Sequence, residues 1–383
     1  MAKKGLAELE PARLTQARRM CGWFMAELAS RTGITRQAIS SFEKLEGGVK
    51  PSPETLRSLA QQLNVDPTFL TAPLRPHELD SALGSAITFR TLSSSSKKDR
   101  EQAKVYLQWL AGLGGFLGEL IEIPSPTIPV FDFGDFSSLT KVQIEQISVD
   151  ARRAFSLGDG PISNLTLLME NKGVLVGYAN LAHKMDGISA WIADRPTVLI
   201  SDKAYYARAR WDLAHELGHL ILHRSLTNDE LETKGMLSKV EEQANYFAGC
   251  FLMPEKTFSS EIYGIDEESL IEAKKRWGTS MQAILMRLRS IKLISESQLI
   301  RAFQQISAKG QRRKEPLDGD TAPERPIFMK KAVEFLSEKK VLELEDFLMR
   351  TCYPVWFLEQ VTGLKRQTTP ASNIVPFRLK AAG

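Results

Sequence analysis

The sequence has 383 residues, of which 43% are hydrophobic and 25% charged, and its formal net charge is +4. This is the composition of an ordinary water-soluble protein with room for two or three domains, and so small a net charge does not by itself point to nucleic acid. The longest apolar run, at residues 107–121, is interrupted by glycines and Glu119, and the first ten residues lack the apolar core of a secretion signal. Three widely spaced cysteines suit a reducing compartment. We therefore expect a cytoplasmic protein with no membrane partner.

Apolar residues recur at helical spacing through residues 14–65, which predicts short helices joined by tight turns. Gly33 falls between two such segments, where a helix-turn-helix needs a residue that tolerates positive φ. Thr35 is a suitable N-cap for a second helix from Arg36 to about Lys44. One side of that helix carries short polar side chains and an arginine, which are used in major-groove readout. The candidate DNA contacts are Arg36, Gln37, Ser40 and Ser41.

Residues 1–75 resemble the Xre/Cro-type helix-turn-helix family. The matching residues are Leu14, Ala17, Arg18, Glu27, Leu28, Ala29, Gly33, Ile34, Thr35, Ile39, Ser40, Glu43, Pro51, Ser52, Leu56, Leu59 and Ala60. The resemblance implies a structural ion pair between Arg18 and Glu43. Phe24-Met25 departs from the Ser or Thr cap followed by Gln, a phosphate contact, that the family usually has, and the turn at residues 45–50 is one or two residues longer. The resemblance therefore implies binding to double-stranded DNA or docking onto a protein partner.

Residues 76–126 are expected to form a helical linker. The serine run at residues 93–96 predicts a turn or flexible segment, and a packing helix is expected from Asp99 to about Glu122. Ile123–Pro129 contains three prolines and must be extended, because each proline biases the preceding residue away from helix. We place the start of the second domain at residue 127.

Residues 127–300 are predicted to be an α+β domain in a multidomain, mainly α chain. Helices are expected at residues 141–157 and from about 162. Strands are expected at residues 172–178, 188–193 and 197–201, with Asp194-Arg195-Pro196 joining the last two as a hairpin. The order is helices, then a sheet of about three strands, then helices from about Ala204 onward.

The motif His215-Glu216-Leu217-Gly218-His219 lies within this last helical pattern. Residues four apart share a helix face, so His215 and His219 can bind one cation. Glu216 follows the first histidine and is placed to take a proton from a bound water. His223 lies about 12 Å from His215 along the helix axis, too far to bind the same ion. We therefore predict that His223 is a helix-end residue outside the site.

A third ligand is expected from the helical segment at residues 240–248. Glu241 is the first choice, because it shares a helix face with Asn245. Asn245 could then hydrogen-bond one of the metal ligands without itself binding the metal. Glu242 is the rival ligand and points off that face.

Residues 211–223, followed by Glu241, Ala244-Asn245, Phe247-Ala248, Leu252-Met253-Pro254 and residues 277–283, resemble the ImmA/IrrE family of zinc metallopeptidases. The resemblance implies Zn²⁺ bound by His215, His219 and Glu241, with Glu216 as the general base. Tyr205, Tyr206, Tyr246 and His183 are candidate donors to the oxyanion, and the hairpin is a candidate edge for an extended substrate peptide.

Members of that family cleave helix-turn-helix repressors. The chain is therefore expected to be a zinc endopeptidase that acts on a repressor or an antitoxin-like partner, as a stress regulator or the toxic member of a pair. The alternative is a non-enzymatic transcriptional regulator in which the metallopeptidase domain is a sensor.

Residues 301–383 are expected to form a helical region with a poorly packed tail. Residues 309–316 predict an exposed basic linker, and helices are expected at 328–338, 342–349 and 355–361. The tail begins at Gln367. The oligomeric state is left open, and a homodimer is one arrangement that the sequence allows.

Overall fold

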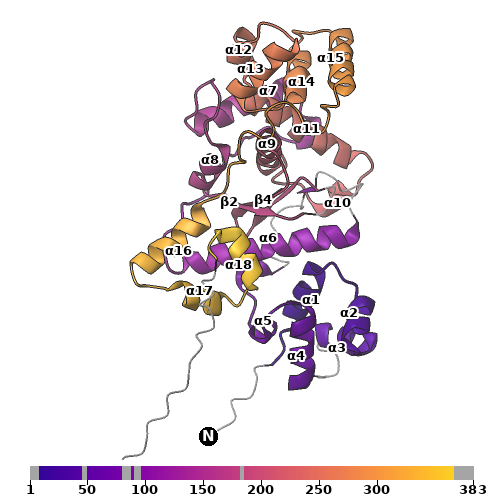
Figure 1. Cartoon of the computed structure of the whole chain (residues 1–383), viewed down its shortest axis with the longest axis vertical. Helices are drawn as coiled ribbons and strands as arrows, with labels where there is room; N and C mark the ends of the chain where they lie inside the picture. Colours follow the sequence, from indigo (N-terminus) through magenta and orange to yellow (C-terminus); the bar gives the residue numbers. More distant parts are fainter. Residues whose placement is uncertain (1–7, 45–49, 80–87, 90–95, 182–184, 366–383) are drawn as a thin grey trace, which may run out of the picture.

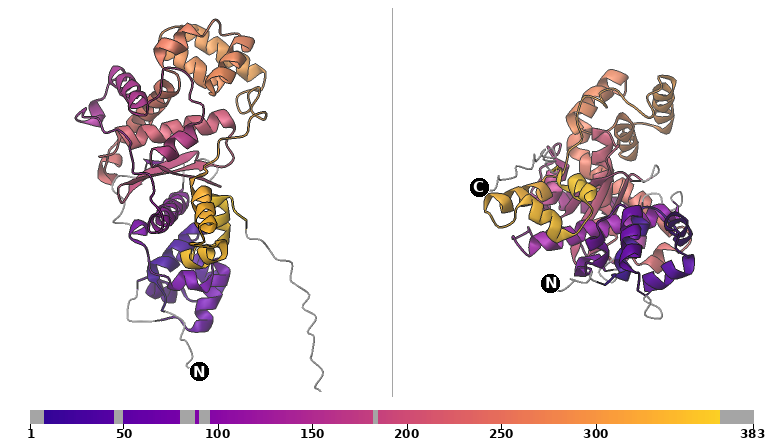
Figure 2. Two further views of the ribbon diagram at one scale, coloured as in Figure 1. Left: turned by 90° about the vertical axis from the view of Figure 1, so that its left-hand side faces the viewer. Right: turned by 60° about the horizontal axis from the view of Figure 1, so that its bottom comes forward.

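The computed structural model describes residues 8–44, 50–79, 88–89, 96–181 and 185–365. The N-terminal helices lie at one end of an elongated molecule, and the helices of the second domain lie at the other (Figures 1 and 2). A small sheet and one long helix lie between them. Within the described ranges, no helix is both long and apolar enough to cross a membrane.

The N-terminal domain is a set of short helices around a common core. Gly33 has a φ of 69° and ends the second helix, while the Ala38 N–H donates to Thr35 Oγ1 at 3.1 Å at the start of the third. Arg18 and Glu43 form the expected ion pair, at 2.5 Å. The helix-turn-helix prediction is confirmed, but most of the longer turn at residues 45–50 lies outside the described residues. The helices are α1 Pro11–Met20, α2 Met25–Thr32, α3 Arg36–Lys44, α4 Pro53–Gln62 and α5 Pro67–Thr71.

Helix α6, Lys97–Gly118, packs against α1 on one side and against the sheet on the other. It begins two residues earlier than predicted, because Ser96 and Asp99 cap its first turn reciprocally. It ends at Gly118 rather than near Glu122. The short 3-10 helix η2, Pro76–Glu78, packs beside it. A packing helix between the domains was the predicted role of this segment.

The sheet has the order β1-β3-β4-β2, with β2 parallel to β4 and β3 antiparallel to β4. Its strands are β1 Thr88–Phe89, β2 Leu175–Ala179, β3 Gly187–Ile192 and β4 Arg195–Ser201. The three predicted strands are present, and β1 was not predicted. The hairpin turn is Ala193-Asp194, with φ values of 46° and 62°, rather than Asp194-Arg195-Pro196. Two left-handed residues make a tight turn that matches the twist of the paired strands.

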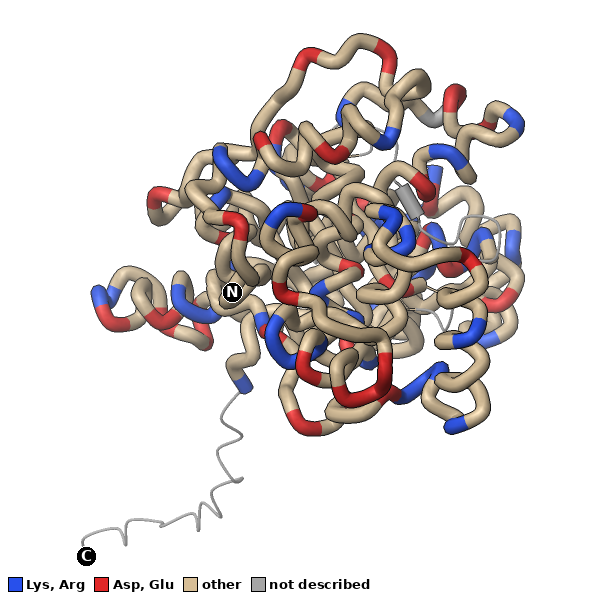
Figure 3. Tube along the Cα trace, turned by 90° about the horizontal axis from the view of Figure 1, so that it is seen from above, with Lys and Arg blue, Asp and Glu red and all other residues tan. Residues whose placement is uncertain are grey.

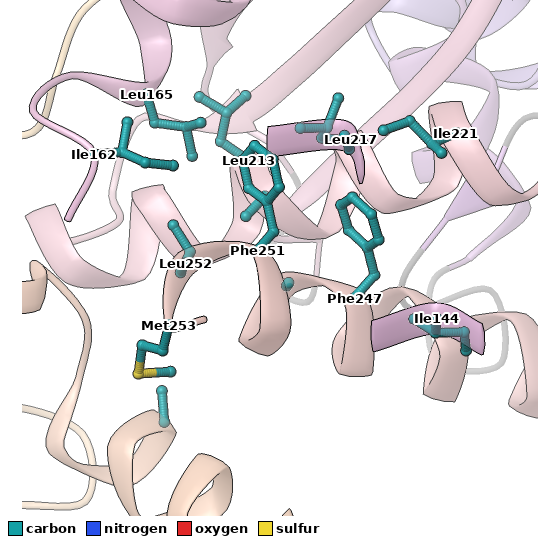
Figure 4. Packing of buried hydrophobic residues seen from close by; sticks show 14 of the residues in the cluster. Ile144, Ile162, Leu165, Leu213, Leu217, Ile221, Phe247, Phe251, Leu252 and Met253 are labelled. Carbon is teal, nitrogen blue, oxygen red and sulfur yellow. The ribbon is translucent and has the colours of Figure 1, made fainter. Parts of the chain in front are cut away.

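The second domain places helix α9, Tyr206–Leu222, between the sheet and helix α11, Met236–Leu252. A Cβ at Gly218 would lie only 3.1 Å from the Phe247 ring and 3.3 Å from the Ala244 backbone, so this glycine allows α9 and α11 to pack closely. Leucines 213 and 217 of α9 face Phe247 and Phe251 of α11 across the core (Figure 4). The remaining helices are α7 Lys141–Ala154, α8 Leu165–Asn171, α10 Asn228–Leu231, α12 Glu255–Ser260, α13 Glu267–Trp277, α14 Met281–Ser290 and α15 Glu296–Ala308, with the 3-10 helix η4 at Phe136–Ser138.

The C-terminal helices return to the middle of the molecule beside α6 (Figure 2). They are α16 Phe328–Glu338, α17 Leu344–Thr351 and α18 Val355–Thr362. Tyr353 and Phe357 pack against Trp109 of α6, at ring-centroid distances of 5.9 and 5.4 Å. The segment at 309–316 was predicted to be an exposed linker, which is wrong at its end, because Glu315 is buried and pairs with Lys274 at 2.9 Å. The predicted tail lies outside the described residues.

Candidate metal centre

The packing of α9 on α11 brings together the two motif histidines and Glu241. The Nε2 atoms of His215 and His219 lie 3.0 Å apart. The Glu241 carboxylate oxygens lie 3.4 Å from His215 Nε2 and 3.3 Å from His219 Nε2. Two ligand atoms at about 2.0–2.2 Å from a tetrahedral zinc ion are separated by roughly 3.3–3.5 Å. The two distances to Glu241 lie in this range, and the distance between the two Nε2 atoms is about 0.3 Å shorter, so a small outward movement of the imidazoles would complete the ligand set of a zinc ion.

Asn245 determines which nitrogen of His215 carries its proton. The Asn245 Nδ2 group donates to the Glu241 carbonyl at 2.8 Å, so its Oδ1 atom faces His215 Nδ1, at 3.2 Å. A carbonyl oxygen can only accept, and Nδ1 of His215 must then be protonated. This leaves the lone pair of His215 on Nε2, which faces Glu241.

A chain of hydrogen bonds through Gln243 and His223, called the tautomer relay below, determines the tautomer of His219. Gln243 Nε2 donates to the Phe136 carbonyl at 2.8 Å, and Gln243 Oε1 accepts from His223 Nε2 at 2.9 Å. Burial lowers the pKa of His223 to about 3, so this ring is neutral at physiological pH and its Nδ1 is an acceptor. The Nδ1–H of His219 donates to it at 2.9 Å. The lone pair of His219 is therefore also on Nε2.

His223 does lie at the end of α9, as predicted, but the prediction that it stays outside the site is wrong. The distance from His215 excludes His223 as a ligand, but it does not exclude a contact with His219. The spacing of four residues between His219 and His223, which puts the two rings on one face, was the signal that could have revealed the contact.

Three acceptors thus face one another with no proton between them: two imidazole lone pairs and a carboxylate. Such a cluster is satisfied by a cation. The rival ligand Glu242 is exposed and pairs with Lys141 at 3.0 Å.

Glu216 is fully buried beside this cluster, under strand β3. The Ser189 hydroxyl donates to Glu216 Oε2 at 2.6 Å. A Cβ at Gly187 would lie 2.8 Å from Glu216 Oε1, so only glycine leaves room for the carboxylate there. Neither Gly187 nor Ser189 was predicted, although their alternation along the strand places both on the side that faces α9.

Comparison with protein-family models gives two matches. Residues 14–70 match the helix-turn-helix model, and residues 169–289 match the peptidase M78 model, described as the IrrE N-terminal-like domain. The chain joins a helix-turn-helix domain to an IrrE-like domain. This is the organisation of a transcriptional regulator with a protease-like domain.

No curated protein matches the sequence. Among solved structures, one match is a Mycobacterium tuberculosis transcriptional regulator, with 20% sequence identity and a TM-score of 0.30. The match covers 38% of this chain and 46% of that one, so the chain spans less than half of the regulator's length. Similarity at this level supports no conclusion about function.

A broad cleft opens beside the ligand cluster of the IrrE-like domain. It has a volume of about 1050 Å³ and extends from Glu241, Asn245 and Tyr246 of α11 to helices α14 and α15. The Tyr246 hydroxyl contacts Glu145 at 3.4 Å. Of the other predicted oxyanion donors, Tyr205 is the exposed N-cap of α9, the Tyr206 ring lies under Arg210, and His183 lies outside the described residues.

The outer edge of strand β3, the predicted site for an extended substrate, is partly occupied by the chain itself. Thr88 and Phe89 pair antiparallel with Ser189 and Ile188. This is the stretch of β3 whose Ser189 contacts Glu216, so the linker backbone lies at the position where a substrate strand would be added.

The predicted DNA contacts lie together on α3 of the helix-turn-helix domain. Arg36 and Gln37 are exposed, and Ser40 and Ser41 are half-buried. Ile39 and Phe42, on the opposite side of the helix, are buried in the domain core.

Proposed function

We propose that the protein is a zinc-dependent endopeptidase that cleaves a transcriptional repressor or an antitoxin-like partner, and that its helix-turn-helix domain docks onto DNA or that partner. The observation that carries the proposal is the convergence of three acceptor atoms beside a buried carboxylate. His215, His219 and Glu241 would hold the metal, and Glu216 would act on the substrate.

Zinc bound by these three residues would polarise a water molecule and the scissile carbonyl. Glu216, held by Ser189 at Oε2, would take the proton of the attacking water and deliver it to the leaving amine. Asn245 and His223 would keep the two imidazoles turned so that their Nε2 atoms face the metal. The residues of the chain thus supply orientation and proton transfer.

The cleft beside the cluster supports a polymeric substrate over a small molecule. Its volume of about 1050 Å³ is at the upper end of what small-molecule sites occupy, and it is open along α11 and α14. A peptide could lie in the cleft and pair with β3, with the scissile bond near Glu216.

A second candidate function is a zinc-bound sensor that regulates transcription without cleaving anything. The pairing of Thr88–Phe89 with β3 favours it, because the chain itself covers part of the edge that a substrate would use. The buried and hydrogen-bonded Glu216 favours the enzyme, since metal binding alone needs no general base.

The test compares the wild-type protein with Glu216→Gln, His215→Ala and Glu242→Gln. Zinc content is measured by atomic absorption, and cleavage is measured on candidate helix-turn-helix repressors, starting with any that is encoded next to the gene. We expect Glu216→Gln to keep zinc and to lose cleavage by a factor of about 10²–10⁴, and His215→Ala to lose both. Glu242→Gln, which removes an exposed carboxylate next to the ligand, should change neither. Zinc binding without cleavage by the wild type would support the sensor.

A further inference from the structure

Helix α6 starts beside the helix-turn-helix domain, although it lies outside residues 14–70. Lys98 Nζ lies 4.4 Å from the centre of the Phe24 ring, at the start of α2, and 2.7 and 2.8 Å from the two Glu27 carboxylate oxygens. The same helix crosses above the N-terminal helices, between them and the sheet (Figure 1). A basic end of the interdomain helix is thus attached to the first helix of the motif.

A pocket of about 570 Å³ lies at this junction, between α1, α2, α3 and α6. Acidic and basic residues are interspersed over the face of the molecule seen from above (Figure 3). The lining of this pocket, the α2–α6 pocket, is by contrast mainly positively charged. Five cationic side chains and one carboxylate line it: Arg18, Arg19, Arg36, Lys97, Lys98 and Glu101.

Not all of this positive charge is neutralised within the protein. Arg18 pairs with Glu43 at 2.5 Å, and Arg19 pairs with Glu101 at 2.8 Å. Arg36 and Lys97 are exposed, and no acidic side chain in the described part of the chain pairs with either of them. Lys98 has three N–H donors and gives two to Glu27, so it retains one.

A basic pocket can bind an anion, and the position of this pocket indicates which kind of anion that would be. When the second helix of such a motif enters the major groove, the first helix crosses the sugar–phosphate backbone. Here α3 carries the exposed Arg36 and Gln37, and the pocket lies at the start of α2, where that backbone would run. Phe24 and Met25 offer no side-chain hydrogen-bond donor at this point, so the donors come from Arg36, Lys97 and Lys98.

We propose that the α2–α6 pocket binds a phosphate group of the DNA backbone, and that Lys97 and Lys98 are DNA contacts supplied from outside the helix-turn-helix domain. The proposal rests on the docking to DNA proposed above. It also implies that a helix packed on the sheet of the IrrE-like domain takes part in DNA binding, since Leu110 of α6 lies against Gly177 of β2.

The test titrates the full-length protein into two fluorescently labelled duplexes, one from the DNA upstream of its gene and one unrelated, over a range of salt concentrations. For Lys97→Ala/Lys98→Ala we expect binding to both duplexes to weaken roughly five- to tenfold per lysine at about 0.1 M salt. The slope of log K against log salt should fall by about one per lysine, because fewer counterions are released on binding for each phosphate contact that is lost. The two duplexes should respond alike, because phosphate contacts carry no sequence information.

The matched control is Lys330→Ala/Lys339→Ala, with Lys330 on α16 and Lys339 directly after its last residue. It also removes two lysines, one paired with Glu334 at 3.7 Å and one lying 5.7 Å from the Phe335 ring centre, and it should leave affinity and slope unchanged. If loss of the Lys98 contacts disturbs folding, Lys97→Gln alone alters an exposed side chain and should still lower the slope by about one.

An unchanged slope and affinity in both lysine variants, with a wild type that binds DNA, would overturn this proposal and leave DNA docking standing. A wild type that binds neither duplex at low salt would overturn the proposed docking to DNA together with it. Neither result bears on zinc-dependent cleavage, which the Glu216→Gln comparison tests separately.

Discussion

The Nδ1 atoms of His219 and His223 lie 2.9 Å apart, one helical turn from each other on α9. Since Gln243 holds the other nitrogen of His223, this contact determines which nitrogen of His219 keeps its lone pair. In the proposed zinc site, His223 would thus position a ligand without being one.

Replacing His223 with alanine should therefore weaken zinc binding by about 10- to 100-fold, because the tautomer and ring orientation of His219 would no longer be fixed. Zinc affinity is measured by competition with a chromogenic chelator, and circular dichroism checks the fold. The control His77→Ala removes a half-buried histidine on η2, far along the chain from the cluster, and should bind zinc as the wild type does. Wild-type zinc affinity in His223→Ala would refute the positioning role.

The ligand cluster could be predicted from the sequence because helical spacing alone determines which side chains share a face. His215 and His219 are four residues apart, as are Glu241 and Asn245, and the two helices needed only to meet. The tautomer relay could not be predicted, since it depends on Gln243 and the Phe136 carbonyl, which lies far away in the sequence.

The sheet shows the same division between local and long-range information. A short apolar run at residues 174–176 predicted β2, and the turn residues at 194–196 predicted β3 and β4 as a hairpin. A strand of two residues has no periodicity, and the pairing of Thr88–Phe89 with Ile188–Ser189 joins segments about a hundred residues apart, so β1 could not be predicted. The start of α6, by contrast, is determined by local residues, because the Ser96–Asp99 capping box fixes it two residues before the apolar pattern begins.

Gly187→Ala should abolish most cleavage while leaving zinc bound. The added Cβ would lie 2.8 Å from Glu216 Oε1, and the carboxylate would have to move. A displacement of about 1 Å at a reacting group costs roughly a hundredfold in rate. The control Gly319→Ala adds a Cβ that meets nothing within 4 Å. Cleavage rates and zinc content are measured side by side, and full activity in Gly187→Ala would contradict the assignment of Glu216 as the base.

Freeing the edge of β3 should speed cleavage. Proline at both Thr88 and Phe89 removes the N–H groups that this segment can offer to β3, so β1 should no longer compete with a substrate strand. We expect a several-fold lower KM with little change in kcat. The double alanine variant keeps both N–H groups and serves as the control. A KM in the proline variant no lower than that of the wild type would show that substrate does not add at this edge.

Arg13 of α1 and Glu78 of η2 form an ion pair whose side chains are both fully buried, and Arg13 Nη2 donates to Glu78 Oε2 at 2.8 Å. Glu78→Gln would leave a buried guanidinium without its counter-charge, which costs about 3–5 kcal/mol. We therefore expect a large drop in the free energy of unfolding, measured by urea titration.

The control Glu8→Gln breaks the exposed pair with Lys50 and should cost at most about 1 kcal/mol. The double variant Arg13→Met/Glu78→Leu should recover most of the loss, because it removes both buried charges together. If instead the double variant is no more stable than Glu78→Gln, the pair contributes through its other contacts, the Arg13 bonds to the Ala72 and Pro73 carbonyls, and not through charge compensation.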